Sequence, residues 1–275
     1  ILFLFSTIEL IISKILKKFE VNSQEIRFIF YCSIALIIVS SIWQIYGWLN
    51  TPPESYFLGI NLISPGDTYV YLSQIEQARQ GKWLPDDLYT SEPQPPTLPS
   101  PLWLIVGLIA SIFRITNLIA YQLIRLILIP IFLFVLYFLI SYFFTEKIKR
   151  KFTFIFLVTS SGWGLILAPL LMPYYFVSPT YINWPMDLWA AEAITFLTLY
   201  QSPLKITSLI LIIFVFLFFL ISTETKKIKY SFLSGAFGLA LIYIHPFEAP
   251  VIYAVLFLFS TYLFLIKKFN DKIKI

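Results

Sequence analysis

The sequence is poor in the residues that form most catalytic and metal sites. Its 275 residues include one cysteine, one histidine and only 13% charged residues. Because Cys32 has no second cysteine to pair with, a disulfide framework within the chain is excluded. There is also no glycine-rich phosphate loop, no Cys/His metal cluster, no nucleophile elbow and no nucleic-acid-binding motif. Nucleic acid is therefore not expected as a partner.

Long apolar runs dominate the chain instead. Hydrophobic residues make up 59% of it and include 28 phenylalanines, and the mean hydropathy is +0.81. This composition is typical of a polytopic membrane protein. Backbone groups in lipid must be satisfied internally, and the alternating pattern of a membrane barrel is absent. The runs therefore predict an all-α transmembrane helix bundle with juxtamembrane helices on its outer face. Spans are predicted near residues 28–49, 118–144, 152–172, 206–222, 231–244 and 251–266.

Residues 1–26 are expected to stand apart from the transmembrane domain, which is predicted to cover residues 27–275. Their apolar run, Ile1–Leu16, contains Glu9 and Lys14. It is too short and too charged for a span, and it predicts an amphipathic helix in the interface or a truncated helix. Because the chain begins without Met and ends just after a lysine-rich stretch, we expect it to be an N-terminal fragment of a longer protein.

The basic residues predict the orientation of the spans. If every basic cluster lies on the inner side, the span 28–49 runs outward and the span 118–144 returns the chain. A crossing by Pro101–Phe113 would put the strongest basic cluster, residues 147–151, outside. This 13-residue run is therefore expected to be re-entrant or to lie on the outer membrane surface. The outer loop 50–117 then holds many of the acids and forms much of the predicted functional face, whereas the inner connections are expected to be solvated basic anchors.

Asp67 is the leading catalytic candidate. It follows the turn sequence Ser64-Pro65-Gly66 and precedes the run Thr68–Gln80, whose apolar residues recur every three to four positions. The run predicts a short amphipathic helix on the membrane surface, with Gly81 as its C-cap. Asp67 could be the N-cap of this helix or a catalytic carboxylate. The two interpretations are compatible, because a capping carboxylate is also held in place.

Two further pairs of acids lie in the predicted outer segments. Asp86 and Asp87 are adjacent and could bind a divalent metal, the one cofactor class considered, or they could form a solvated turn. Asp187 and Glu192 lie beside two tryptophans. Aromatic residues at the membrane–water interface suit an interfacial belt, and they also suit stacking against a sugar ring.

Arg125 and His245 are candidates because of where they lie. Arg125 is about seven residues into an apolar span, where a guanidinium is costly unless it reaches the interface or meets an anion. It could bind a phosphate or pair with an outer acid. His245 is the only histidine and has Glu248 three residues on, with a turn expected at Pro246. This pair could be structural or functional.

The order of these features leads to a family resemblance. A first span is followed by Gly66-Asp67-Thr68-Tyr69-Val70-Tyr71, then by "PSPLWLIVGLIASIFRI" and by a second span that bears Arg125. In this layout residues 27–150 resemble the GT-C superfamily of membrane glycosyltransferases, which includes protein mannosyltransferases and lipid A aminoarabinose transferases. Two features depart from the family pattern. Many members carry two adjacent acids where Asp67 stands alone, and members generally have more spans.

The resemblance implies sugar transfer from a polyprenyl-phosphate donor to a lipid, glycan or protein acceptor at the outer face of a cell membrane, with membrane lipid as a further partner. Asp67 would act as the base or orient the acceptor, and Arg125 and His245 would contact the phosphate. The implied substrate-binding residues are Tyr69, Tyr71, Arg125, Asp187, Glu192, His245 and Glu248. A transporter or lipid flippase and a non-catalytic membrane subunit are the alternatives. Transport is disfavoured because the polar residues collect in loops and not at mid-bilayer.

Overall fold

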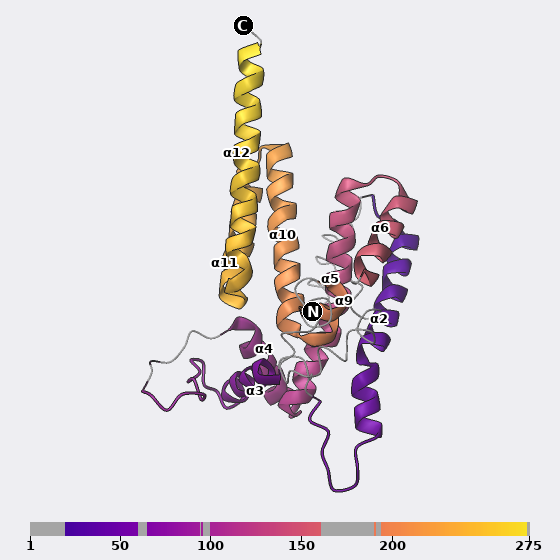
Figure 1. Ribbon diagram of the computed structural model, residues 1–275, viewed down its shortest axis with the longest axis vertical. Helices are drawn as coiled ribbons and strands as arrows, with labels where there is room; N and C mark the ends of the chain where they lie inside the picture. Colours follow the sequence, from indigo (N-terminus) through magenta and orange to yellow (C-terminus); the bar gives the residue numbers. More distant parts are fainter. Residues whose placement is uncertain are drawn as a thin grey trace, which may run out of the picture. The chain divides into compact units, whose positions relative to one another are not determined.

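A computed structural model of the chain describes residues 20–59, 65–93, 95, 100–160, 190 and 194–273. Every regular element in these residues is helical (Figure 1), which confirms the predicted all-α fold. The chain divides into two compact units, Ile1–Thr207 and Ser208–Ile275. The helices are α2 (Ser23–Leu49), α3 (Pro65–Arg79), α4 (Pro101–Phe113), α5 (Asn117–Phe143), α6 (Lys147–Thr159), α9 (Thr195–Gln201), α10 (Pro203–Thr225), α11 (Ile228–Ile244), η3 (Pro246–Glu248) and α12 (Ala249–Ile273).

Four helices in the described part of the chain are long and apolar enough to cross a membrane. They are Ser23–Leu49, Asn117–Phe143, Pro203–Thr225 and Pro246–Ile266. They match the spans predicted near 28–49, 118–144, 206–222 and 251–266, so the protein is membrane-embedded. The predicted span 231–244 lies in α11, which is a shorter apolar helix of 17 residues. Of the predicted span 152–172, residues 161–172 lie outside the described residues.

The arrangement of α2 is that of a membrane helix, with its polar side facing the protein. Its buried residues are Glu25, Ile29, Ser33 and Ser40, which recur at intervals of four and seven along one face. Its opposite side exposes large apolar side chains that include Phe30, Ile34, Ile38, Ile42 and Ile45. Such an exposed surface suits lipid, because small and polar residues are favoured between transmembrane helices. The helix α2 packs against α5 (Figure 1), and Glu25 and Ser40 of its polar face bond to side chains of α5.

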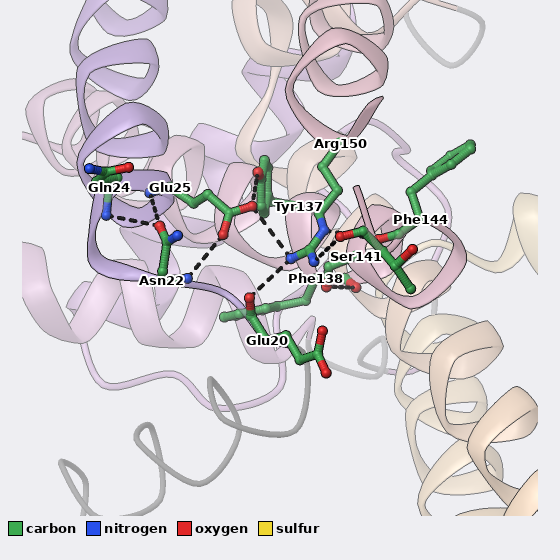
Figure 2. A network of polar contacts seen from close by, with 10 residues as sticks. Glu20, Asn22, Gln24, Glu25, Tyr137, Phe138, Ser141, Phe144 and Arg150 are labelled. Carbon is green, nitrogen blue, oxygen red and sulfur yellow. Dashed lines mark hydrogen bonds and ion pairs between the residues drawn. The ribbon is translucent and has the colours of Figure 1, made fainter. Parts of the chain in front are cut away.

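A buried ion pair ties the first turn of α2 to the start of α6. Glu25 accepts a hydrogen bond from the Tyr137 hydroxyl on α5 at 2.7 Å and pairs with Arg150 of α6 at 3.4 Å (Figure 2). Its second oxygen accepts from the backbone N–H of Asn22 at 3.0 Å, which completes a capping box. Arg150 also donates to backbone carbonyls on both sides, at Glu20 and Phe144. One carboxylate therefore joins three helices.

The burial of Arg150 corrects one expectation. The basic stretch 147–151 was expected to be a solvated anchor, but the Arg150 residue is only 2% exposed. Its neighbour Lys149 does lie at the surface, paired with Glu146. Arg150 differs because the α5–α6 turn directs it inward, where Glu25 compensates its charge.

Close packing fixes α3 on α4. Gly107 of α4 permits the approach, because a Cβ at this position would lie 2.7 Å from the Ile75 carbonyl oxygen. The Trp103 ring stacks between Tyr71 of α3, at 4.7 Å between centroids, and Tyr121 of α5, at 5.8 Å. The helix predicted over Pro101–Phe113 is confirmed to the residue. Its position relative to the membrane stays a prediction.

The second unit consists of α11, η3, α12 and the part of α10 from Ser208 onward. The Ser234 hydroxyl on α11 donates to the Val215 carbonyl of α10 at 2.9 Å. Pro246 begins the short η3 helix, which confirms the turn predicted between His245 and Glu248. The core of this unit is formed by Leu211, Val215, Leu241 and Ile252.

Candidate functional site

Asp67 lies in the first turn of α3 and is exposed. The prediction that Asp67 is the N-cap is wrong, because the helix begins two residues earlier, at Pro65. Proline is favoured in a first turn, where its missing N–H costs no helical hydrogen bond, and this moves the start of the helix upstream. The carboxylate still lies at the positive end of the helix, which stabilises its charge. Asp67 is therefore an exposed acid held on an ordered backbone.

The rest of α3 anchors this acid to the first unit. Glu76 accepts a hydrogen bond from the Asn117 side chain at the start of α5, at 2.6 Å, and this bond holds the pKa of Glu76 below its usual range. Gly81, with φ of +86°, ends the helix, and the Lys82 N–H returns to the Gln77 carbonyl at 2.8 Å. This is the predicted glycine C-cap. Both contacts lie in the C-terminal half of α3, and near its other end Thr68, the neighbour of Asp67, is buried, so packing holds the backbone that carries Asp67.

The two tyrosines near Asp67 have different surroundings. Tyr69 is 44% exposed and lies two residues from Asp67, so it is accessible to a ligand. Tyr71 stacks on Trp103 and belongs to the aromatic column that continues to Tyr121. Its ring supports the packing of α3 on α4.

Arg125 is the most completely bonded side chain of the site. The residue is 1% exposed on α5, and all five of its N–H groups donate to protein acceptors. Its Nε donates to Gln122 at 2.8 Å. The other four bonds go to Ser40 at 3.2 Å, the Leu199 carbonyl at 3.0 Å, Ser41 at 2.9 Å and Gln44 at 2.7 Å. These acceptors are all neutral, and a direct bond to a phosphate would have to displace one of them.

A groove of about 600 Å³ lies beside this network, between α2 and α5. Gln44 and Gln122 contribute its polar groups next to Arg125. The Gln122 amide nitrogen donates to the Gly59 carbonyl at 3.3 Å. The Gln44 amide nitrogen is buried and has no hydrogen-bond partner among the residues that the structure describes. The apolar walls include Ile45, Trp48, Phe57, Leu118 and Leu123.

The sequence interpretation missed the partners of Arg125. Hydropathy averages four of these polar partners into the apolar runs around them: Ser40, Ser41, Gln44 and Gln122. Their spacing nevertheless carries a signal that could have identified them. Ser33, Ser40 and Gln44 are spaced by seven and four residues, which places them on one face of a helix. A polar stripe inside a predicted span identifies the face that meets other helices.

The adjacent acids predicted as metal ligands are engaged elsewhere. Asp86 forms an ion pair with Lys82, and its backbone is held by the Gln77 amide in two hydrogen bonds. The Asp87 carboxylate accepts from the Tyr89 N–H at 2.9 Å, as in a solvated turn. Within the described ranges no three His, Cys, Asp or Glu side chains gather as a metal site. A metal at Asp86 and Asp87 stays a prediction.

The remaining candidates belong to other parts of the chain. In the second unit, Nδ1 of His245 lies 3.4 Å from Oε1 of Glu248, and both side chains are mostly buried. Asp187 and Glu192 lie outside the described residues. Comparisons of the chain with protein-family models, with curated proteins and with solved structures found no match.

Proposed function

We propose that the protein is a multi-pass glycosyltransferase of a cell membrane, of the GT-C type, which transfers a sugar from a polyprenyl-phosphate donor at the outer face. The observation that carries this proposal is the exposed Asp67 carboxylate on α3, a short, mostly polar helix between the first span and α4. The Glu76–Asn117 bond holds α3 at the end of α5 where the span begins. An acid fixed at the end of a membrane span suits an acceptor in water and a donor in lipid.

In this proposal Asp67 takes the proton from the acceptor hydroxyl as that oxygen bonds to the sugar carbon. The bond from the sugar carbon to the phosphate oxygen breaks, and polyprenyl phosphate leaves as a stable anion, so no strong acid is required. Tyr69 is exposed two residues from Asp67 on the same helix and is a further candidate for contact with the acceptor. Arg125 makes no direct contact with the donor phosphate in this proposal, because its N–H groups are all bonded within the protein.

The test is sugar transfer in membranes that contain the protein, with radiolabelled polyprenyl-phosphate sugars as donors. Asp67→Asn keeps the size of the side chain and removes the base, so transfer should fall about 10²–10⁴-fold. Thermal stability should change little, because a first-turn acid contributes at most about 1 kcal/mol at an exposed position.

The matched control is Glu92→Gln, which neutralises another exposed acid of the same loop. This variant should transfer sugar at the wild-type rate. Full activity of Asp67→Asn would refute the catalytic assignment. Movement of the labelled lipid across the membrane without sugar transfer would refute the enzyme and favour a flippase.

A further inference from the structure

Gln44 lines the groove between α2 and α5, and chemistry fixes which way its amide group is turned. A guanidinium can only donate, so the amide oxygen of Gln44 must face Arg125, to which it is bonded at 2.7 Å. The amide nitrogen of Gln44 then points away from Arg125. That nitrogen is buried and lacks an acceptor among the described residues. A buried donor without an acceptor costs about 1–3 kcal/mol, so this position favours a ligand oxygen.

The surroundings of this donor carry positive charge. No ion pair in the described part of the chain includes Arg125, and its five acceptors are neutral side chains and a carbonyl. Its bond to Gln44 polarises the amide and strengthens the N–H donor. The polar end of the groove therefore favours an oxygen that belongs to an anionic molecule.

The depth of the donor in the membrane indicates which oxygen it meets. Tyr46 and Trp48 are exposed in the last turn of α2 and suit the head-group level of a bilayer. Gln44 lies five residues before Leu49, the last residue of the helix, which is about 8 Å at 1.5 Å per residue. This is below the phosphate layer, at the level of the ester carbonyls of a glycerophospholipid. Polyprenyl phosphate has no acceptor at this depth, because its chain below the phosphate is hydrocarbon.

We propose that this groove is a binding site for an anionic glycerophospholipid. One acyl chain lies along the apolar walls formed by Ile45, Leu118 and Leu123. An ester carbonyl oxygen accepts from Nε2 of Gln44, and the phosphate lies above it in the positive potential of Arg125. The volume of about 600 Å³ is within the range of ligand pockets. This site is separate from Asp67 and does not depend on the proposed sugar transfer.

The test compares lipid binding by the purified full chain in a neutral detergent. Phosphatidylglycerol and phosphatidylcholine with the same acyl chains are titrated, and retained lipid is measured by native mass spectrometry and by the shift in Tm. The wild-type protein should bind phosphatidylglycerol about tenfold more tightly than phosphatidylcholine. Gln44→Glu keeps the acceptor for Arg125 but replaces the donor with a negative oxygen, so it should abolish this preference. Leu123→Trp fills the groove without changing the polar network and should weaken binding of both lipids.

Gln24→Glu is the matched control, since it makes the same change at the exposed, opposite end of the same helix. It should bind both lipids as the wild-type protein does. Equal binding by wild type, Gln44→Glu and Leu123→Trp would overturn the proposal. If Gln44→Glu does not fold, Leu123→Trp decides the question alone. Sugar transfer is not measured in this assay, so failure of the proposed enzyme would leave its result unchanged.

Discussion

Replacing the buried carboxylate of Glu25 should destabilise the first unit strongly. Three donors converge on this group: the Tyr137 hydroxyl at 2.7 Å, the Asn22 N–H at 3.0 Å and the Arg150 guanidinium at 3.4 Å. Glu25→Gln preserves the shape but replaces one accepting oxygen with a donating NH₂ group. Tyr137 and Arg150 share one oxygen and Asn22 uses the other. Either orientation of the amide therefore sets an N–H group against a donor.

The size of the effect follows from burial. Glu25 is fully buried and Arg150 is 2% exposed. Water therefore does not screen this ion pair and cannot replace a missing partner. Removing one member of a buried ion pair costs about 3–5 kcal/mol, because the other charge is left uncompensated. For a chain of this size, each kcal/mol lowers Tm by about 2–4 °C. Glu25→Gln should therefore lower Tm by about 10 °C.

The assay is thermal unfolding of the purified protein in detergent, followed by tryptophan fluorescence. Glu146→Gln is the control, because it breaks the exposed pair with Lys149 at 2.6 Å, which should contribute less than about 1 kcal/mol. The double variant Glu25→Leu with Arg150→Met leaves no buried charge and should be more stable than either single variant. Equal Tm values for wild type and Glu25→Gln would refute this account of the anchor.

Two further variants test α3. Gly107→Ala should cost about 2 kcal/mol, because its new methyl group would lie 2.7 Å from the Ile75 carbonyl oxygen. Gly235→Ala, a helical glycine with open space around it, should be neutral or stabilising, and equal Tm shifts would contradict the close-packing argument. Glu76→Gln should be less stable than wild type at pH 7, because the Asn117 bond lowers the pKa of Glu76 and stabilises the fold only while the carboxylate is charged. That difference in Tm should shrink as the pH falls below about 4 and Glu76 becomes protonated; a difference that persists at low pH would refute the role of the charge.

The parts of the fold that follow from local chemistry could be predicted. Proline in the first turn and the left-handed Arg114 at the end define α4 as Pro101–Phe113, and the sequence predicted the same bounds. Pro246 breaks the helix after His245, and the expected turn is present. The long apolar runs predicted α2, α5, α10 and most of α12, because hydropathy alone selects segments of that length.

The positions of single polar side chains could not be predicted in the same way. Hydropathy averages Ser40 and Gln44 into an apolar run, and only the helical register shows that they share a face with the buried Glu25. Arg150 stands among lysines in sequence but is drawn inward by an acid 125 residues away. The sequence pattern predicts that the helix begins at Thr68, just after Asp67, but α3 begins three residues earlier, because Pro65 and Gly66 belong to its first turn. In each case the position of the side chain is decided by a partner on another helix or by the backbone conformation, and hydropathy reports neither.

The two buried arginines of the first unit differ in what balances their charge. Arg150 pairs with Glu25, so its charge is cancelled within the protein and its contribution is to the fold. Arg125 is bonded through all five N–H groups to neutral acceptors, so its geometry is as fixed as that of Arg150 but its charge is not cancelled by them. A cation that is buried and fully bonded gains nothing further in hydrogen bonds from an anion, but it still attracts one through space. Of the two variants, Arg125→Gln should therefore cause the larger loss of anionic lipid binding. Arg150→Gln should cause the larger disturbance of helix packing.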